Sequence, residues 1–247
     1  MNKIKPFIGI SIALFFLFTM PTIQAQVKGK VDRNQIFRPY WQVGLRVGTP
    51  VFLGDVKRYR YVPASDEWRA AAGISVSRRL IPVLELEATY NFGKLAGSDR
   101  YVNQLFESRF HEISLRGLVH LTDVMGLNEN SFPVAFNLVA GAGLCIYQST
   151  LFERTSHTLL KKSDHHKEGI LLVGLNIDIR LKQNIFLRVE SVNTGMHSDW
   201  MDFKKSGFPY DVYNLTMIGL NYRFRYGRGG GGYYPKKVVR RRFHRGF

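Results

Sequence analysis

The chain has 247 residues, of which 45% are hydrophobic, and its formal net charge is +16. This length fits one medium-sized domain or one small barrel. The single cysteine, Cys145, excludes an internal disulfide, so an exported protein with this sequence has to be stabilised by a large core or by lipid.

The first 25 residues are typical of a secretory signal peptide. Residues 1–5 are basic, residues 7–20 are apolar and uncharged, and residues 21–25 end in a small residue suitable for cleavage. We therefore predict a mature chain that begins at Gln26. The apolar run is shorter than the roughly 20 residues of a transmembrane helix. An uncleaved amphiphilic anchor is the alternative, whereas the lack of a following cysteine argues against a lipoprotein anchor.

After a polar lead-in at residues 26–39, which we expect in the periplasm, residues 40–226 alternate between apolar and polar side chains. For example, Leu84, Leu86 and Ala88 alternate with Glu85 and Glu87. A period of two separates such residues onto the two sides of a strand, which a helix with 3.6 residues per turn cannot do. The pattern predicts eight strands, at residues 40–48, 68–79, 83–93, 109–121, 133–147, 169–181, 185–193 and 213–226.

The connections between these strands alternate in length. Short turns are expected at residues 80–82 and 182–184, and long links at residues 49–67, 94–108, 148–168 and 194–212. Outer-membrane β-barrels have this pattern, with short periplasmic turns and long extracellular loops. The link at residues 122–132 is longer than the pattern requires. An even number of strands would leave both termini in the periplasm.

The two faces of the predicted strands differ in composition. One face ends in aromatic residues such as Trp41, Tyr90 and Phe224, as expected at membrane interfaces. We therefore predict an all-β antiparallel transmembrane barrel in the outer membrane of a Gram-negative bacterium. Its narrow interior would hold a network of paired charges, formed by Arg46, Glu85, Glu87, Glu112, Arg116, Asp178, Arg180, Arg188, Glu190 and Arg223. A secreted lipocalin-like carrier, with the apolar face inside, is the alternative.

Several short motifs follow one another along the body of the chain. They are Val51-Phe52-Leu53-Gly54-Asp55, Tyr90-Asn91-Phe92-Gly93-Lys94-Leu95-Ala96-Gly97-Ser98-Asp99, Phe110-His111-Glu112-Ile113-Ser114, Ala140-Gly141-Ala142-Gly143, Ser198-Asp199 and Leu220-Asn221-Tyr222-Arg223-Phe224. In this order they resemble a family of small Bacteroidetes outer-membrane barrels that includes the type IX secretion component PorG. The resemblance implies an anchor or accessory of a cell-envelope assembly such as the type IX secretion system. The link at residues 122–132 and the C-terminal tail depart from the family pattern.

Four groups of side chains are candidates for chemistry on residue type alone. Glu85 and Glu87 would point into the interior, where paired carboxylates are expected in salt bridges. His197-Ser198-Asp199 contains a possible nucleophile and base, but neighbours on an extended segment point to opposite sides. Asp164-His165-His166 offers too few convergent ligands for a metal, and Cys145 is expected to pack. We therefore predict a non-catalytic protein without cofactor or metal, and keep a small barrel enzyme that modifies lipid A as the alternative.

The segment at residues 227–247 is predicted to be a basic tail in the periplasm. Its glycine-rich start is typical of a flexible spacer, and its cations are Arg228 and the cluster Lys236, Lys237, Arg240, Arg241, Arg242 and Arg245. The composition is also similar to RNA-binding segments, but export separates the tail from nucleic acid. We expect it to bind an anionic periplasmic or secretion-machinery partner, lipid headgroups or the cell wall; a solvated end without a partner is the alternative.

Overall fold

The computed structural model describes residues 39–53, 65–99, 102–126, 133–156, 158–196 and 211–224. The predicted signal peptide, the lead-in up to residue 38 and the predicted tail lie outside the described residues. Among the described residues, no helix is long and apolar enough to cross a membrane.

Eight long strands dominate the described structure. They are β1 (Trp41–Phe52), β2 (Ala71–Ile81), β3 (Leu84–Asp99), β4 (Gln104–His120), β5 (Val134–Glu153), β7 (His166–Arg180), β8 (Ile185–Met196) and β9 (Asp211–Phe224). There are also two short elements, strand β6 (Leu159–Lys162) and helix α2 (Leu121–Val124). Both lie in segments predicted to be connections, except that Leu121 was predicted to end a strand.

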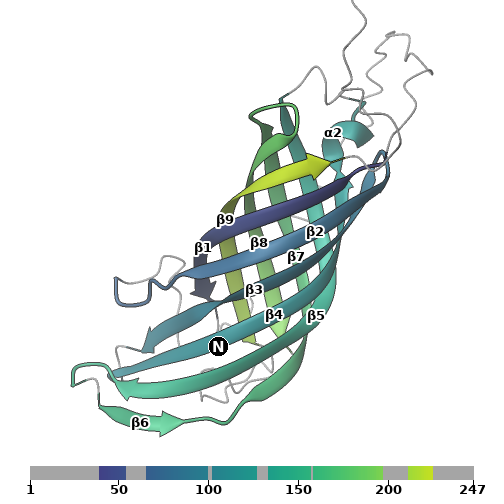
Figure 1. The fold of residues 1–247 in the computed structure, drawn as a ribbon. Helices are drawn as coiled ribbons and strands as arrows, with labels where there is room; N and C mark the ends of the chain where they lie inside the picture. The colour runs from purple at the N-terminus through teal and green to yellow at the C-terminus, as the bar shows by residue number, and fades with distance from the viewer. Residues whose placement is uncertain are drawn as a thin grey trace, which may run out of the picture. The chain divides into compact units, whose positions relative to one another are not determined.

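The eight long strands close into an antiparallel barrel (Figure 1). Each pairs with the next along the chain, β5 pairs with β7, and β9 returns to pair with β1. The short strand β6 pairs with the extended end of β5 and lies outside the ring. The prediction of an all-β antiparallel barrel of about eight strands is therefore confirmed.

The pairing register also gives the tilt of the strands. A row of paired residues starts at Trp41 and passes through Arg78, Leu86, Gly117, Ala140, Val173, Asn193 and Asn214. It returns to β1 at Val51, ten positions beyond its start. In a ring of eight strands, such a shift corresponds to a tilt of about 40° from the barrel axis.

Several strands continue beyond their predicted ends. Residues 94–99, 104–108 and 148–153 were assigned to long links, but they extend β3, β4 and β5. In this region Lys94 pairs with Arg109, and Glu107 pairs with Thr150. Backbone hydrogen bonds hold these rungs together whatever the polarity of the side chains, so hydrophobic alternation underestimates the strand lengths.

We call the barrel end with the β2–β3 and β7–β8 connections the turn end, and the opposite end the hairpin end. The inward face is charged near the turn end, whereas near the hairpin end it is largely apolar. Phe106, Phe110, Tyr147 and Tyr213 pack there in one buried cluster. This apolar half was not predicted from the sequence. A closed interior can be filled by apolar side chains as well as by paired charges, because apolar side chains need no polar partner.

Candidate functional site

The most organised polar region is a buried cluster of charges in the turn half of the interior. It arises from register, since Glu87 faces Arg116 on β4, and Asp178 on β7 faces Arg188 on β8. Because side chains alternate along a strand, these pairs share the inner surface. We use the name charge cluster for seven residues: Arg46, Glu85, Glu87, Arg116, Asp178, Arg188 and Glu190.

Glu87 lies at the centre of the charge cluster and is fully buried. Arg116 Nε donates to Glu87 Oε1 at 3.0 Å, and Arg188 Nη1 donates to Oε2 at 2.6 Å. Arg46 Nη1 lies 3.8 Å from Oε1. One carboxylate is therefore surrounded by three guanidinium groups that come from three different strands.

Each of these arginines also contacts a second carboxylate. Arg46 Nη1 donates to Glu190 Oε1 at 2.7 Å, and Arg116 Nη2 donates to Glu190 Oε2 at 3.2 Å. Arg188 donates two hydrogen bonds to the Asp178 carboxylate, from Nε to Oδ1 at 2.7 Å and from Nη2 to Oδ2 at 2.9 Å. Bridging of this kind offsets the cost of burying charge and joins distant parts of the wall.

Two glycines make room for Arg46 on the inner surface. In register, Arg46 lies between Gly73 on β2 and Gly219 on β9. A Cβ atom at Gly219 would lie 2.7 Å from the Cβ of Arg46 and would clash with the carbonyl oxygen of Leu45. The glycines thus allow a large buried arginine to fit into a narrow barrel.

His120 extends the charge cluster toward the turn end and was not singled out from the sequence. Its Nε2 lies 3.1 Å from Glu85 Oε2, and Arg188 Nη2 lies 4.0 Å from Glu85 Oε1. Following the alternation of β4 from Arg116 through Leu118 to the next inward position would have found His120.

Aromatic and cationic side chains fill the turn end of the interior. The Arg223 guanidinium lies between two rings, 3.9 Å from the centre of Tyr40 and 4.0 Å from that of Phe186. Arg79 donates to the Tyr40 hydroxyl at 3.1 Å and forms an ion pair with Asp123 of α2. Arg223, which was predicted as a member of the charge network, thus packs against two aromatic rings at this end.

Glu112 belongs to a different environment from the charge cluster. Asn91 Nδ2 donates to its Oε1 at 2.9 Å, and the Tyr213 hydroxyl donates to its Oε2. Cys145 lies fully buried in the neighbouring apolar cluster. Of the other predicted network members, Arg180 ends β7, near the turn end. The fold therefore divides the ten predicted charges among several environments.

The remaining candidates for chemistry are only partly described. His197-Ser198-Asp199 lies outside the described residues. In Asp164-His165-His166, the His166 ring stacks on Tyr147 with 5.5 Å between ring centres, and Asp164 accepts a hydrogen bond through its carbonyl oxygen. Within the described ranges, no group of three or more His, Cys, Asp or Glu side chains could hold a metal ion.

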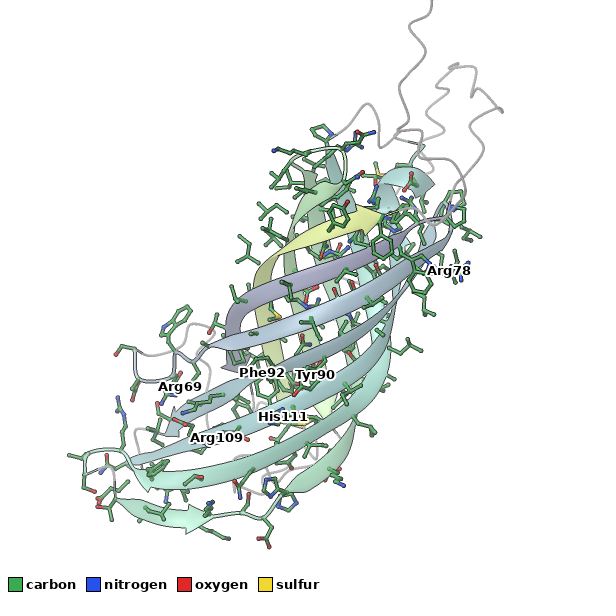
Figure 2. All side chains as sticks on the ribbon, viewed as in Figure 1. Arg69, Arg78, Tyr90, Phe92, Arg109 and His111 are labelled. Carbon is green, nitrogen blue, oxygen red and sulfur yellow. The ribbon has the colours of Figure 1, made fainter. Side chains whose placement is uncertain are left out.

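The outward face of the barrel is a broad apolar band. Leu45 is 64% exposed and Leu171 is 71% exposed, and most outward positions between them around the wall are aliphatic. Aromatic side chains border the band, with Trp41, Tyr222 and Phe224 near the turn end. Figure 2 shows a second group, in which Tyr90, Phe92 and His111 lie close together on β3 and β4.

Charged residues begin beyond this second aromatic group. Glu107 pairs with Lys94 Nζ at 2.9 Å and with Arg69 Nε at 3.0 Å, and Arg109 lies nearby (Figure 2). Burial alone would raise the pKa of the Glu107 carboxyl, but hydrogen bonds from Lys94 and Arg69 outweigh it and lower the pKa. The wall thus changes from apolar to ionic within a few residues along β3 and β4.

No protein-family model and no curated protein sequence matches the chain. Its fold is similar to that of Neisserial surface protein A, at 14% identity and a TM-score of 0.42, covering 75% of this chain and 97% of that one. For Ail of Yersinia pestis, solved with the heparin analogue sucrose octasulfate, the identity is 8%, the TM-score 0.46 and the coverages 76% and 100%. A major outer membrane protein of Thermus thermophilus is similar at 12% identity and a TM-score of 0.42, covering 74% of this chain and 99% of that one.

Proposed function

We propose that the protein is an integral outer-membrane β-barrel without catalytic activity, which anchors or assists a cell-envelope assembly. The observation that carries this proposal is the inverted polarity of the barrel. Arg116, Arg188 and Glu87 are buried inside, whereas Leu45 and Leu171 are exposed outside. A broad apolar surface of this extent is unfavourable in water but stable in lipid.

The dimensions of the wall support the membrane location. The long strands have between 11 and 20 residues, and a tilted strand needs roughly 9–11 to cross a bilayer. Closure of the ring satisfies the backbone groups that an open edge would leave without partners in lipid. The predicted signal peptide supplies the export step that an outer-membrane barrel requires.

We further propose that the turn end faces the periplasm. β1 begins and β9 finishes at this end, which also carries the connections at residues 82–83 and 181–184. Bacterial barrels have their short turns on the periplasmic side. The basic tail would then extend from β9 into the periplasm, where it could reach an anionic partner.

The filled interior supports an anchoring role over transport or catalysis. Each carboxylate of the charge cluster is engaged by arginine or histidine, so these groups are poorly suited to exchange protons with a substrate. The apolar cluster occupies the hairpin half of the interior, and a soluble carrier would need a cavity there and a polar exterior. An accessory role in type IX secretion is what the family resemblance implies, and it is part of this proposal.

The membrane location can be tested by fractionation combined with gel migration. We expect the full chain to be recovered with outer membranes and to migrate differently on gels before and after boiling, as closed barrels do. Recovery in the soluble periplasm would contradict the proposal. A His197→Ala variant assayed for lipid A modification separates the anchor from the enzyme, because only an enzyme would lose activity.

A further inference from the structure

The apolar band is interrupted by one group of uncharged polar side chains. Outward positions of three neighbouring strands, β8, β9 and β1, contribute to it (Figure 1). We use the name polar patch for its five residues, which are Thr49, Ser191, Asn193, Asn214 and Thr216. Elsewhere around the described wall, the outward positions between the aromatic borders are apolar or glycine.

The register shows that the polar patch lies at the height of the apolar band. A row of pairs leads from Thr216 through Ser191, Leu175 and Leu138 to Val119 on β4, halfway around the ring. Because the strands are tilted, such a row moves along the barrel axis, and over this half circuit it shifts by about five residues toward the turn end. Thr216 is therefore level with Leu115 and Ile113 on the opposite wall, which are 55% and 60% exposed.

Four of the five side chains of the polar patch already bind one another, whereas the Thr49 hydroxyl donates to the backbone carbonyl of Pro50. Asn214 Nδ2 donates to Ser191 Oγ and to Asn193 Oδ1, both at 3.0 Å, and Thr216 Oγ1 donates to Asn214 Oδ1 at 2.8 Å. Among the described residues, the Asn193 side chain accepts one hydrogen bond and donates none. The patch is thus an ordered surface with unused donors that point outward.

Hydrocarbon offers no partner for those donors. Lipid tails cannot form hydrogen bonds, so outward amides and hydroxyls at this depth gain when another protein surface covers them. Small residues also favour close contact between membrane segments. Gly195 continues the row of outward positions on β8, and a Cβ atom there would meet open space. The surface is therefore both polar and flat.

We propose that the polar patch is the contact surface of a homodimer, in which β8, β9 and β1 of two copies meet within the membrane. This inference rests on the proposed membrane location. An interface with two-fold symmetry must be complementary to itself. Asparagine, serine and threonine satisfy this condition because each side chain both donates and accepts hydrogen bonds. A charged patch would repel its own copy, and the five patch residues carry no charge.

Cysteine cross-linking in outer membranes tests the dimer. The full chain would carry Thr216→Cys at the centre of the patch, or Leu115→Cys at the same height on the opposite wall as a control. The native chain, whose one cysteine is the buried Cys145, is the blank. With an oxidant or a short bis-maleimide, we expect at least tenfold more product of twice the monomer mass from Thr216→Cys than from Leu115→Cys.

A second measurement tests the hydrogen-bonding explanation. The double variant Asn193→Leu/Asn214→Leu should remain heat-modifiable, yet its dimer fraction in mild detergent should fall at least tenfold, whereas Ile113→Leu should leave the fraction unchanged. Equal cross-linking from both walls, or none from Thr216→Cys in membrane-embedded barrels, would overturn the dimer alone. A product of another mass would overturn it in favour of a different protein partner. Recovery of the barrels outside the membrane would overturn the proposed function as well.

Discussion

Arg188 Nη1 donates a hydrogen bond to Glu87 Oε2 at 2.6 Å across the barrel interior, although the two residues are 101 positions apart in the sequence. They belong to β8 and β3, which are not neighbours in the ring. The contact therefore connects opposite parts of the wall directly. Together with the bridges made by Arg46 and Arg116, it braces the turn half of the barrel.

Removing one arginine from the charge cluster should be strongly destabilising. We expect Arg188→Met to lower the free energy of unfolding by about 3–5 kcal/mol, because it leaves Glu87 and Asp178 buried with fewer partners. Arg109→Met, on the outer surface, should change it by less than about 0.5 kcal/mol. Urea titration of the refolded barrels in lipid vesicles measures both. Equal stabilities would mean that the cluster does not brace the barrel.

A charged side chain introduced into the apolar band should destabilise the barrel more strongly the closer it lies to the middle of the bilayer. Leu175→Arg should destabilise the membrane-inserted barrel by about 2–4 kcal/mol, because Leu175 lies near the middle of the band. Gly169→Arg is the control on the same face of β7, with open space around it, and should cost about 0–1 kcal/mol. Folding yields in vesicles report the difference, and similar yields would show that this face does not meet lipid.

Gly219 should not tolerate a larger side chain, because Arg46 occupies the space beside it. We expect Gly219→Val to cost about 1–3 kcal/mol through overpacking. Gly117→Val is a matched strand control, since the nearest atom to its added Cβ would be 3.8 Å away. The two variants can be compared by the temperature at which the heat-modifiable band is lost. If Gly117→Val loses the band at the lower temperature, then the space beside Gly219 does not limit the stability of the barrel.

The Glu107 carboxyl should titrate below its ordinary pKa of 4.5, since the ion pairs with Lys94 and Arg69 favour the charged form. A lowered folded-state pKa means that these contacts stabilise the hairpin end above pH 4.5. That contribution is lost as the pH falls through the folded value. Carboxyl NMR titration of Glu107 measures this, and Lys94→Gln should move the midpoint upward. A midpoint unchanged by Lys94→Gln would contradict the assigned cause.

Deleting residues 227–247 should leave the barrel folded but weaken periplasmic binding. In the described structure the last strand ends at Phe224, so the deletion leaves every described pair of the ring in place. The segment contains seven basic residues and no acidic one, and binding through exposed charges weakens as salt rises. Pull-downs of full-length and truncated protein at low and high salt test this. Loss of heat-modifiable migration after truncation would place the tail in the barrel, and unchanged binding would make it a solvated end.

Alternation along strands such as 83–93 and 169–181 was enough to predict an antiparallel barrel and which side chains face outward. This succeeds because the period of two follows from the local geometry of any strand and needs no knowledge of its neighbours. Strand ends were less predictable. Residues 148–153 are mostly polar and were assigned to a link, yet they are paired, because ladder hydrogen bonds form between backbones.

The period of two, the all-β barrel class and the inward direction of Glu87, Arg116 and Arg188 could all be predicted from the amino-acid pattern. Which of these charges meet could not, because partners across a barrel depend on the ten-residue shift around the ring, which no single strand encodes. The same shift brings Ser191 on β8 and Thr216 on β9 to the height of Leu115 and so reveals the polar patch. Local alternation determines whether a side chain points inward or outward, whereas register and tilt determine which side chains meet across the barrel.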